Sequence, residues 1–151
     1  MNQHSTNSQN NVTVELLSEM YRNVTMGSET LSMVVPKVHG SEMLTNITGQ
    51  MEQYGQFTTR TEEMLKRLEV MPRESSLMKR SMTKMGIAMN TAMDPSDNHI
   101  AAMIGKGTMT GLTELTGKLH KLKEADQGAA DLCREILAFE KEQTMKILEY
   151  T

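Results

Sequence analysis

Carboxylate and imidazole side chains are the groups in this sequence that could carry out metal chemistry, and their spacing decides which kind. A di-iron site among helices takes a Glu from each of two helices and a Glu-x-x-His motif from each of the other two. The histidines are His4, His39, His99 and His120, and none of them has a Glu three residues earlier in the chain. The sequence therefore lacks the usual di-iron motif.

Glu140 is the carboxylate that helical spacing places near the centre of an apolar face, one turn from Ile136 and Thr144. It could be a metal ligand or an acid–base group, with Glu114 at the margin of the preceding helix's face. The simpler interpretation is a buried carboxyl group satisfied by Tyr54, a Thr hydroxyl or water. We favour the simpler interpretation and keep a reduced metal site at Glu140 and Glu114 as the alternative.

Other reaction types find even less support in the sequence. Haem would need an inward histidine or a Cys-x-x-Cys-His motif, and neither is present. The segment from Gly105 to Thr108 lacks the G-x-x-x-x-G-K-[ST] pattern of a phosphate loop. Cys133 falls on a core face with no histidine near it in the pattern, so a small buried hydrophobic side chain is expected. We therefore predict no enzyme activity and no cofactor.

Composition narrows the class of protein further. The chain has 151 residues, enough for one domain, and its net charge of -3 gives no reason to expect nucleic acid as a ligand. Its one cysteine rules out an internal disulfide. No run of about 18 apolar residues is present, so we predict no membrane insertion. Residues 1–11 lack the features of a signal peptide, which predicts a cytoplasmic protein.

Five stretches have apolar residues at the three- and four-residue spacing of a helix, and no strand pattern competes with them. They run from about residue 12 to 38, 41 to 69, 76 to 93, 98 to 123 and 127 to 150. Pro36 should bend or end the first helix, and Ser41 should cap the second. Either Ser96 or Asp97 should cap the fourth.

Short connections between long helices make neighbouring helices antiparallel. The predicted fold is therefore all-α, an antiparallel four-helix bundle plus one shorter helix. Residues 12–151 should form this single domain, preceded by a flexible N-terminal tail of polar residues, 1–11.

Glycines on the predicted inner faces have two interpretations. Gly27, Gly107 and Gly111 lie on these faces, although a glycine inside a helix costs about 1 kcal/mol relative to alanine. A missing side chain would let another helix approach closely, which is the packing role that we predict. The same three positions could instead leave a cavity for a small ligand.

Methionine is unusually frequent, with 16 residues against two phenylalanines. A first set repeats at helical spacing and should fill the core: Met78, Met82, Met85 and Met89. A second set lies away from the centres of the inner faces: Met26, Met33, Met103 and Met109. Because exposed methionines make adaptable contact surfaces, this second set is predicted to mediate association.

Several short segments together carry a family resemblance. They are Met26-Gly27, Tyr54, Met85 to Asn90, Asp97 to Ala101, Gly107 to Gly111 and Phe139-Glu140. Over about residues 12–150 the chain resembles small ferritin-like bundle proteins of unassigned function from Gram-positive bacteria. The resemblance implies a ferritin-like helical bundle in the cytoplasm and does not imply a known reaction.

Three functions remain open from the sequence. The favoured one is a non-enzymatic protein that acts by self-association, as a homodimer or larger homo-oligomer, or by binding a protein partner. The alternative is a ferritin-like metal-binding protein with a degenerate site near Glu140. The third is a carrier that holds a small ligand in a cavity at Gly27, Gly107 and Gly111.

Overall fold

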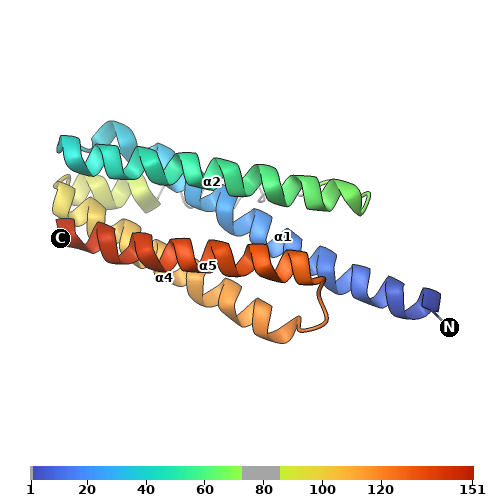
Figure 1. The fold of residues 1–151 in the computed structure, drawn as a ribbon. Coiled ribbons are helices and arrows are strands. Elements are labelled where there is room, and N and C mark those ends of the chain that lie inside the picture. The colour runs from blue at the N-terminus through green and yellow to red at the C-terminus, as the bar shows by residue number, and fades with distance from the viewer. Residues whose placement is uncertain (1, 73–85) are drawn as a thin grey trace.

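The computed structural model describes residues 2–72 and 86–151. Met78, Met82 and Met85 of the predicted core set lie outside the described residues. Within the two described ranges every regular element is a helix, which confirms the all-α prediction (Figure 1). None of the helices in these ranges offers an apolar stretch that could cross a lipid bilayer.

The element bounds follow the predicted order. They are α1 Asn2–Val34, the 3-10 turn η1 Val35–Lys37, α2 Ser41–Arg67, α4 Asp97–Lys121, α5 Gln127–Ile147 and the 3-10 turn η2 Leu148–Tyr150. Residues 86–93 are helical as well. Pro36 lies in η1, so it ends α1 as predicted.

The start of α1 differs from the prediction. The helix begins at Asn2, so residues 2–11 extend it and do not form a separate tail. Side chains 3–11 are exposed and take no part in the core. No proline or glycine interrupts this stretch, and extending an existing helix adds one hydrogen bond for each residue that is ordered. Local propagation therefore continues the helix beyond its packed part.

The start of α2 is held by another helix rather than by its own cap. Gly40, not Ser41, is the N-cap residue, and it makes no side-chain cap hydrogen bond. The backbone N–H groups of His39 and Gly40 donate to the Asp97 carboxylate at 2.9 and 2.6 Å. Ser96, one of the two predicted caps of α4, accepts from the His99 N–H. Asp97 therefore connects α4 to α2.

Four long helices of the described chain lie side by side in an antiparallel arrangement (Figure 1). Helix α1 packs against α2 and α4, and α5 packs against the same two helices from the other side. Tight connections join α1 to α2 and α4 to α5, whereas one long connection leads from α2 to α4. Each helix therefore contributes one face to a shared core.

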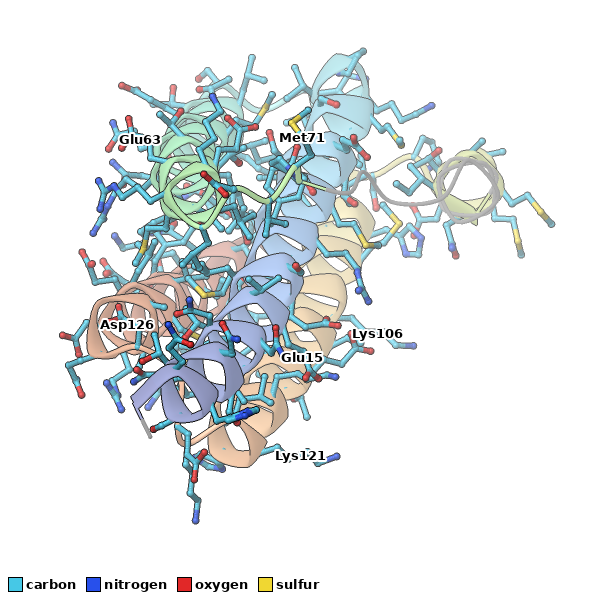
Figure 2. All side chains as sticks on the ribbon, turned by 90° about the vertical axis from the view of Figure 1, so that its right-hand side faces the viewer. Glu15, Glu63, Met71, Lys106, Lys121 and Asp126 are labelled. Atoms are coloured by element: carbon cyan, nitrogen blue, oxygen red, sulfur yellow. The ribbon has the colours of Figure 1, made fainter. Side chains whose placement is uncertain are left out.

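The core is aliphatic, with a small aromatic group between α2 and α5. Its largest fully buried side chains include Leu16, Leu17, Met20, Met43, Ile47, Tyr54, Leu65, Ile100, Ile136 and Ile147. The ring of Phe139 meets the rings of Tyr54 and Phe57 edge-on, with centroids 5.2 and 5.4 Å apart. Charged side chains such as Lys106 and Lys121 extend away from the helices (Figure 2).

Met89 departs from the predicted core stripe, because 63% of its surface is exposed. On the same helical segment Ile87 and Thr91 are buried instead. The inward face of residues 86–93 is therefore rotated from the face that the methionine spacing indicated.

Gly27 offers a direct test of the packing between α1 and α2. A Cβ atom at Gly27 would lie 2.7 Å from Cζ of Tyr54, whereas one at Gly49 in α2 would meet nothing within 4 Å. We expect Gly27→Ala to lower the free energy of unfolding by about 1–3 kcal/mol through overpacking. Gly49→Ala should raise it by about 1 kcal/mol through helix propensity. Urea denaturation followed by circular dichroism measures both, and a gain in both variants would contradict the close contact.

Candidate functional site

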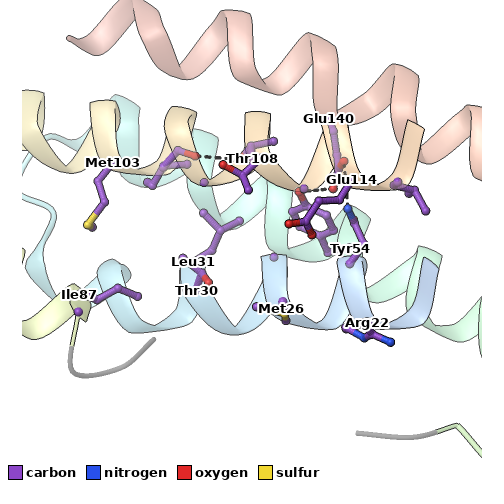
Figure 3. Close-up of a pocket in the computed structure, with 18 of the residues that line it drawn as sticks. Arg22, Met26, Thr30, Leu31, Tyr54, Ile87, Met103, Thr108, Glu114 and Glu140 are labelled. Atoms are coloured by element: carbon purple, nitrogen blue, oxygen red, sulfur yellow. Dashed lines mark hydrogen bonds between the residues drawn. The ribbon is translucent and has the colours of Figure 1, made fainter. Parts of the chain in front are cut away.

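A pocket of about 440 Å³ opens between α1 and α4 (Figure 3). Tyr54 of α2, Glu140 of α5 and residues Gly86, Ile87 and Asn90 of the helical segment 86–93 also line it. Glu140, Glu114 and Tyr54 lie at one end, which we call the polar end (Figure 3). Met103 and Ile87 lie at the opposite, apolar end (Figure 3). The pocket therefore has a polar end and an apolar end.

The three predicted glycines all line this pocket, but they act differently. Gly27 lies against the Tyr54 ring, and a Cβ at Gly111 would lie 3.1 Å from Nδ2 of Asn23. These two positions show the predicted close approach. Gly107 does not, because a Cβ there would meet nothing within 4 Å. Gly107 leaves open space, and the close approach missed from the sequence is at Gly105, where a Cβ would lie 3.0 Å from Leu148.

Glu140 is buried at the polar end, with 2% of its surface exposed. The Tyr54 hydroxyl donates to its Oε1 at 3.2 Å, and Nδ2 of Asn23 donates to its Oε2 at 3.4 Å. Burial raises the pKa of Glu140 to about 7, and these two hydrogen bonds oppose the rise. The predicted contact with Tyr54 is therefore present, and the same burial and the nearby carboxylate raise the pKa of the Tyr54 hydroxyl.

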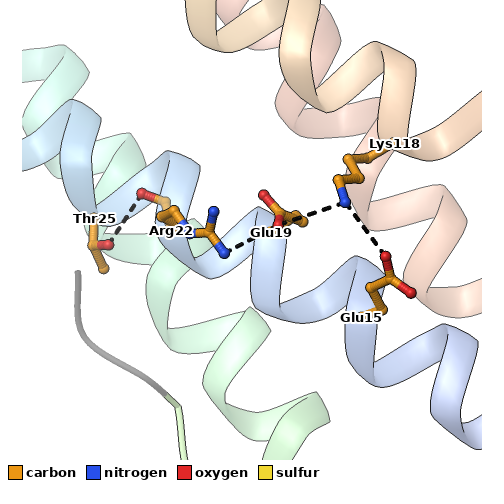
Figure 4. A network of polar contacts seen from close by, with 5 residues as sticks. All are labelled: Glu15, Glu19, Arg22, Thr25 and Lys118. Carbon is orange, nitrogen blue, oxygen red and sulfur yellow. Dashed lines mark hydrogen bonds and ion pairs between the residues drawn. The ribbon is translucent and has the colours of Figure 1, made fainter. Parts of the chain in front are cut away.

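Arg22, the cation in the described pocket lining, and Lys118, four residues after Glu114 on α4, are engaged with other carboxylates. Arg22 pairs with Glu19 at 3.0 Å within α1. Lys118 of α4 reaches Glu15 at 3.3 Å and Glu19 at 3.9 Å (Figure 4). Within the described residues, Glu140 has neutral hydrogen-bond donors and no ion pair.

The structure brings the two predicted metal ligands to the same pocket, and Glu19, the third carboxylate in the described lining, pairs with Arg22. Glu114 is exposed where it lines the pocket, in contrast to the buried Glu140. Across residues 2–72 and 86–151, no three His, Cys, Asp or Glu side chains come together as metal ligands would. Two carboxylates alone make a poor site for a transition metal, which in proteins takes three or four ligands.

The four methionines predicted to mediate association do not share one environment. Met26 and Met103 line the pocket, and Met33 packs half-buried against the core. Met109 is 47% exposed. Two of the four therefore belong to the wall of a cavity.

Cys133 is buried on the core side of α5, as predicted. Burial raises the pKa of its thiol to about 12. A nucleophilic cysteine acts as the thiolate, so this thiol is not activated for reaction.

Comparisons with family models, curated proteins and solved structures find no match for this chain. Asn23 also belongs to this site and was not predicted from the sequence. Its spacing of four residues before Gly27 places both on one face of α1, which is the signal that could have indicated it.

The burial of Glu140 predicts a pH-dependent stability. Folding raises the pKa of this group from an ordinary 4.5 to about 7, so the folded state binds the proton more tightly. The resulting stabilisation is complete below about pH 4.5 and is lost as the pH rises through 7. Glu140→Gln cannot titrate, so its stability relative to wild type should rise by about 1–3 kcal/mol from pH 5 to pH 8.

Urea denaturation at the two pH values measures this difference. Glu142→Gln is the matched control, because Glu142 lies on the same helix and is exposed. The control should change its relative stability by less than about 0.5 kcal/mol. A pH-independent difference between Glu140→Gln and wild type would show that the carboxyl group is not buried in the folded protein.

Proposed function

We propose that this chain is a small-molecule binding protein that holds a largely apolar ligand in the pocket between α1 and α4. The observation that carries the proposal is the position of Glu140, a buried acid at one end of an otherwise largely apolar wall. Ligand sites typically combine such a wall with a few convergent polar groups. This develops the carrier function that the three glycines suggested.

The dimensions of the pocket support this proposal. Ligand pockets span roughly 300 to 1,000 Å³, and this one has about 440 Å³. Its aliphatic wall comes mainly from two helices and includes Met26, Leu31, Ile104 and Leu115. A ligand that filled this space would remove apolar surface from water. Each Å² of buried apolar surface would contribute about 25 cal/mol to the binding free energy.

The lining favours binding over catalysis. The described lining residues offer Glu140 as a proton-exchanging group, but no serine or cysteine nucleophile accompanies it. Thr108, a hydroxyl in the wall, donates to the Ile104 carbonyl of its own helix at 3.0 Å. We therefore propose a non-enzymatic role, and the scarcity of ligands around Glu140 and Glu114 makes metal binding the weaker alternative.

We further propose that the four long helices form a ferritin-like four-helix bundle. Two features support this: neighbouring helices are antiparallel, and a single long connection joins α2 to α4. Ferritin-like folds have one such crossover. In this proposal the ligand pocket occupies the interior where active ferritin-like proteins hold metal. The cytoplasmic location stays a prediction from the sequence.

Filling the pocket should abolish ligand binding without unfolding the protein. Gly107→Leu places a side chain in the open space beside Gly107, so we expect the affinity for the neutral apolar probe N-phenyl-1-naphthylamine to fall at least tenfold. Probe fluorescence measures the affinity, and circular dichroism measures stability. Loss of a glycine from the helix should keep the variant at least as stable as wild type.

Gly117→Leu is the matched control for this experiment. Gly117 lies on the same helix, a Cβ there meets nothing within 4 Å, and it does not line the pocket. The control should bind the probe like wild type. Equal affinities in Gly107→Leu and Gly117→Leu would refute binding in this pocket.

Self-association remains a second candidate, favoured by exposed methionines on the helical residues 86–93. Met93 is 87% exposed and Met89 is 63% exposed. They are four residues apart, so they lie on the same face of a helix. We propose that this face contributes to a homodimer or larger homo-oligomer.

Sedimentation equilibrium tests this candidate. The wild type should form a dimer or larger species at tens of micromolar, and Met89→Ser/Met93→Ser should shift it towards monomer. The control is Met145→Ser, which changes a methionine 65% exposed on α5 and should leave the mass unchanged. A wild-type monomer at all concentrations would remove this candidate.

A further inference from the structure

We propose that the ligand of this pocket is an organic amine with an apolar body, whose ammonium group lies between Glu140 and Asn23. The inference rests on the proposed small-molecule binding function and names the ligand class for it. It follows from the charge of the polar end, from an unused acceptor beside Glu140, and from the apolar character of the opposite end.

The first observation is a missing positive charge. A carboxylate taken out of water is costly unless a cation compensates it. In the described chain, Glu140 receives hydrogen bonds only from the neutral groups of Tyr54 and Asn23. Arg22 lines the pocket and pairs with the half-buried Glu19, and Lys118 of α4 pairs with the exposed Glu15 and with Glu19. A ligand ammonium would supply the compensating charge.

The second observation is an unused acceptor. Oδ1 of Asn23 is buried and has no hydrogen-bond partner among the described residues. The amide directs its N–H group to Glu140, which leaves this oxygen at the same end of the pocket. An ammonium group has three N–H donors and no acceptor. It can therefore donate to the Glu140 carboxylate, and a rotation of the Asn23 amide on binding would bring the buried oxygen within reach of a second N–H group.

The surrounding charges favour a cation over an anion. Glu114 lines the same end of the pocket and has no ion pair within the described residues. With the charge of Arg22 balanced by Glu19, the two remaining acids leave this end negative. A carboxylate or phosphate ligand would be repelled here, and a neutral alcohol would leave the charge of Glu140 uncompensated.

The opposite end selects the rest of the ligand. Met103 and Ile87 lie at the apolar end, away from Glu140 along the pocket (Figure 3). Methionine side chains adapt to ligands of different shape. An alkyl or aryl group attached to the amine would therefore fill this end.

Three probes that share one alkyl chain separate the ligand classes: n-octylamine, 1-octanol and octanoate. Isothermal titration calorimetry at pH 8 should show that wild type binds octylamine at least tenfold more tightly than octanol, and octanoate most weakly. Glu140→Gln should bring the octylamine and octanol affinities within about threefold of each other. Glu142→Gln, with the same change of charge on the exposed side of α5, should keep the preference.

The possible failures are distinguishable. If none of the three probes binds, the pocket is not a ligand site and both proposals fall. If octanol binds as tightly as octylamine to wild type, the binding function stands and the amine inference is wrong. A preference for octylamine that persists in Glu140→Gln would also overturn the inference, because the selectivity would then arise elsewhere.

The pH dependence provides an independent readout. The titratable and charged groups that line the pocket with Glu140 are Glu19 and Arg22 of α1, Tyr54 of α2 and Glu114 of α4, and Cys133 of α5 is close enough for the charge of Glu140 to affect its pKa. With the pKa of Glu140 near 7 in the empty pocket, a proton competes with the amine below that pH. Octylamine should bind about tenfold more weakly at pH 6 than at pH 8, and octanol equally at both. A pH-independent octylamine affinity would contradict the contact with Glu140.

Discussion

The burial of one carboxyl group is the constraint on which the arrangement of these helices depends. Glu140 lies inside the protein, where its charge loses the stabilisation of water. The structure compensates in part by bringing two neutral donors to it from two other helices, Tyr54 from α2 and Asn23 from α1. Both donors need space, and glycines provide it. Gly27 admits the tyrosine ring, and Gly111 admits the asparagine amide.

The same glycine-rich surfaces explain why a pocket exists at this place. Where a side chain from a neighbouring helix fills the space beside a glycine, the helices are in close contact. Where none does, as at Gly107, the space stays open. The pocket therefore begins at the hydrogen bonds of Glu140 and continues along the unfilled face of α4. An incompletely compensated acid next to an open apolar space is a feature that protein interiors rarely keep for stability alone.

The exposed charges play a different part. Arg60 of α2 makes two hydrogen bonds to Glu135 of α5, and Lys118 joins α4 to α1, but exposed pairs of this kind contribute about 1 kcal/mol or less. Near the pocket these ion pairs neutralise the cations that could otherwise compensate Glu140. Arg22 and Lys118 are engaged by carboxylates of α1, so the polar end of the pocket keeps its negative character.

Much of the fold was determined by the sequence alone, because apolar residues at helical spacing and helix-ending residues such as Pro36 act locally. The same spacing placed Glu140 among apolar neighbours, with Tyr54, a Thr hydroxyl or water as its possible partners. Tertiary structure alone decided how the helices face each other. The rotation of each helix about its own axis left open space beside Gly107, exposed Met89 and placed the Asn23 amide against Glu140. Periodicity indicates which side of a helix is buried, but the space beside a glycine depends on the side chain that a different helix presents there.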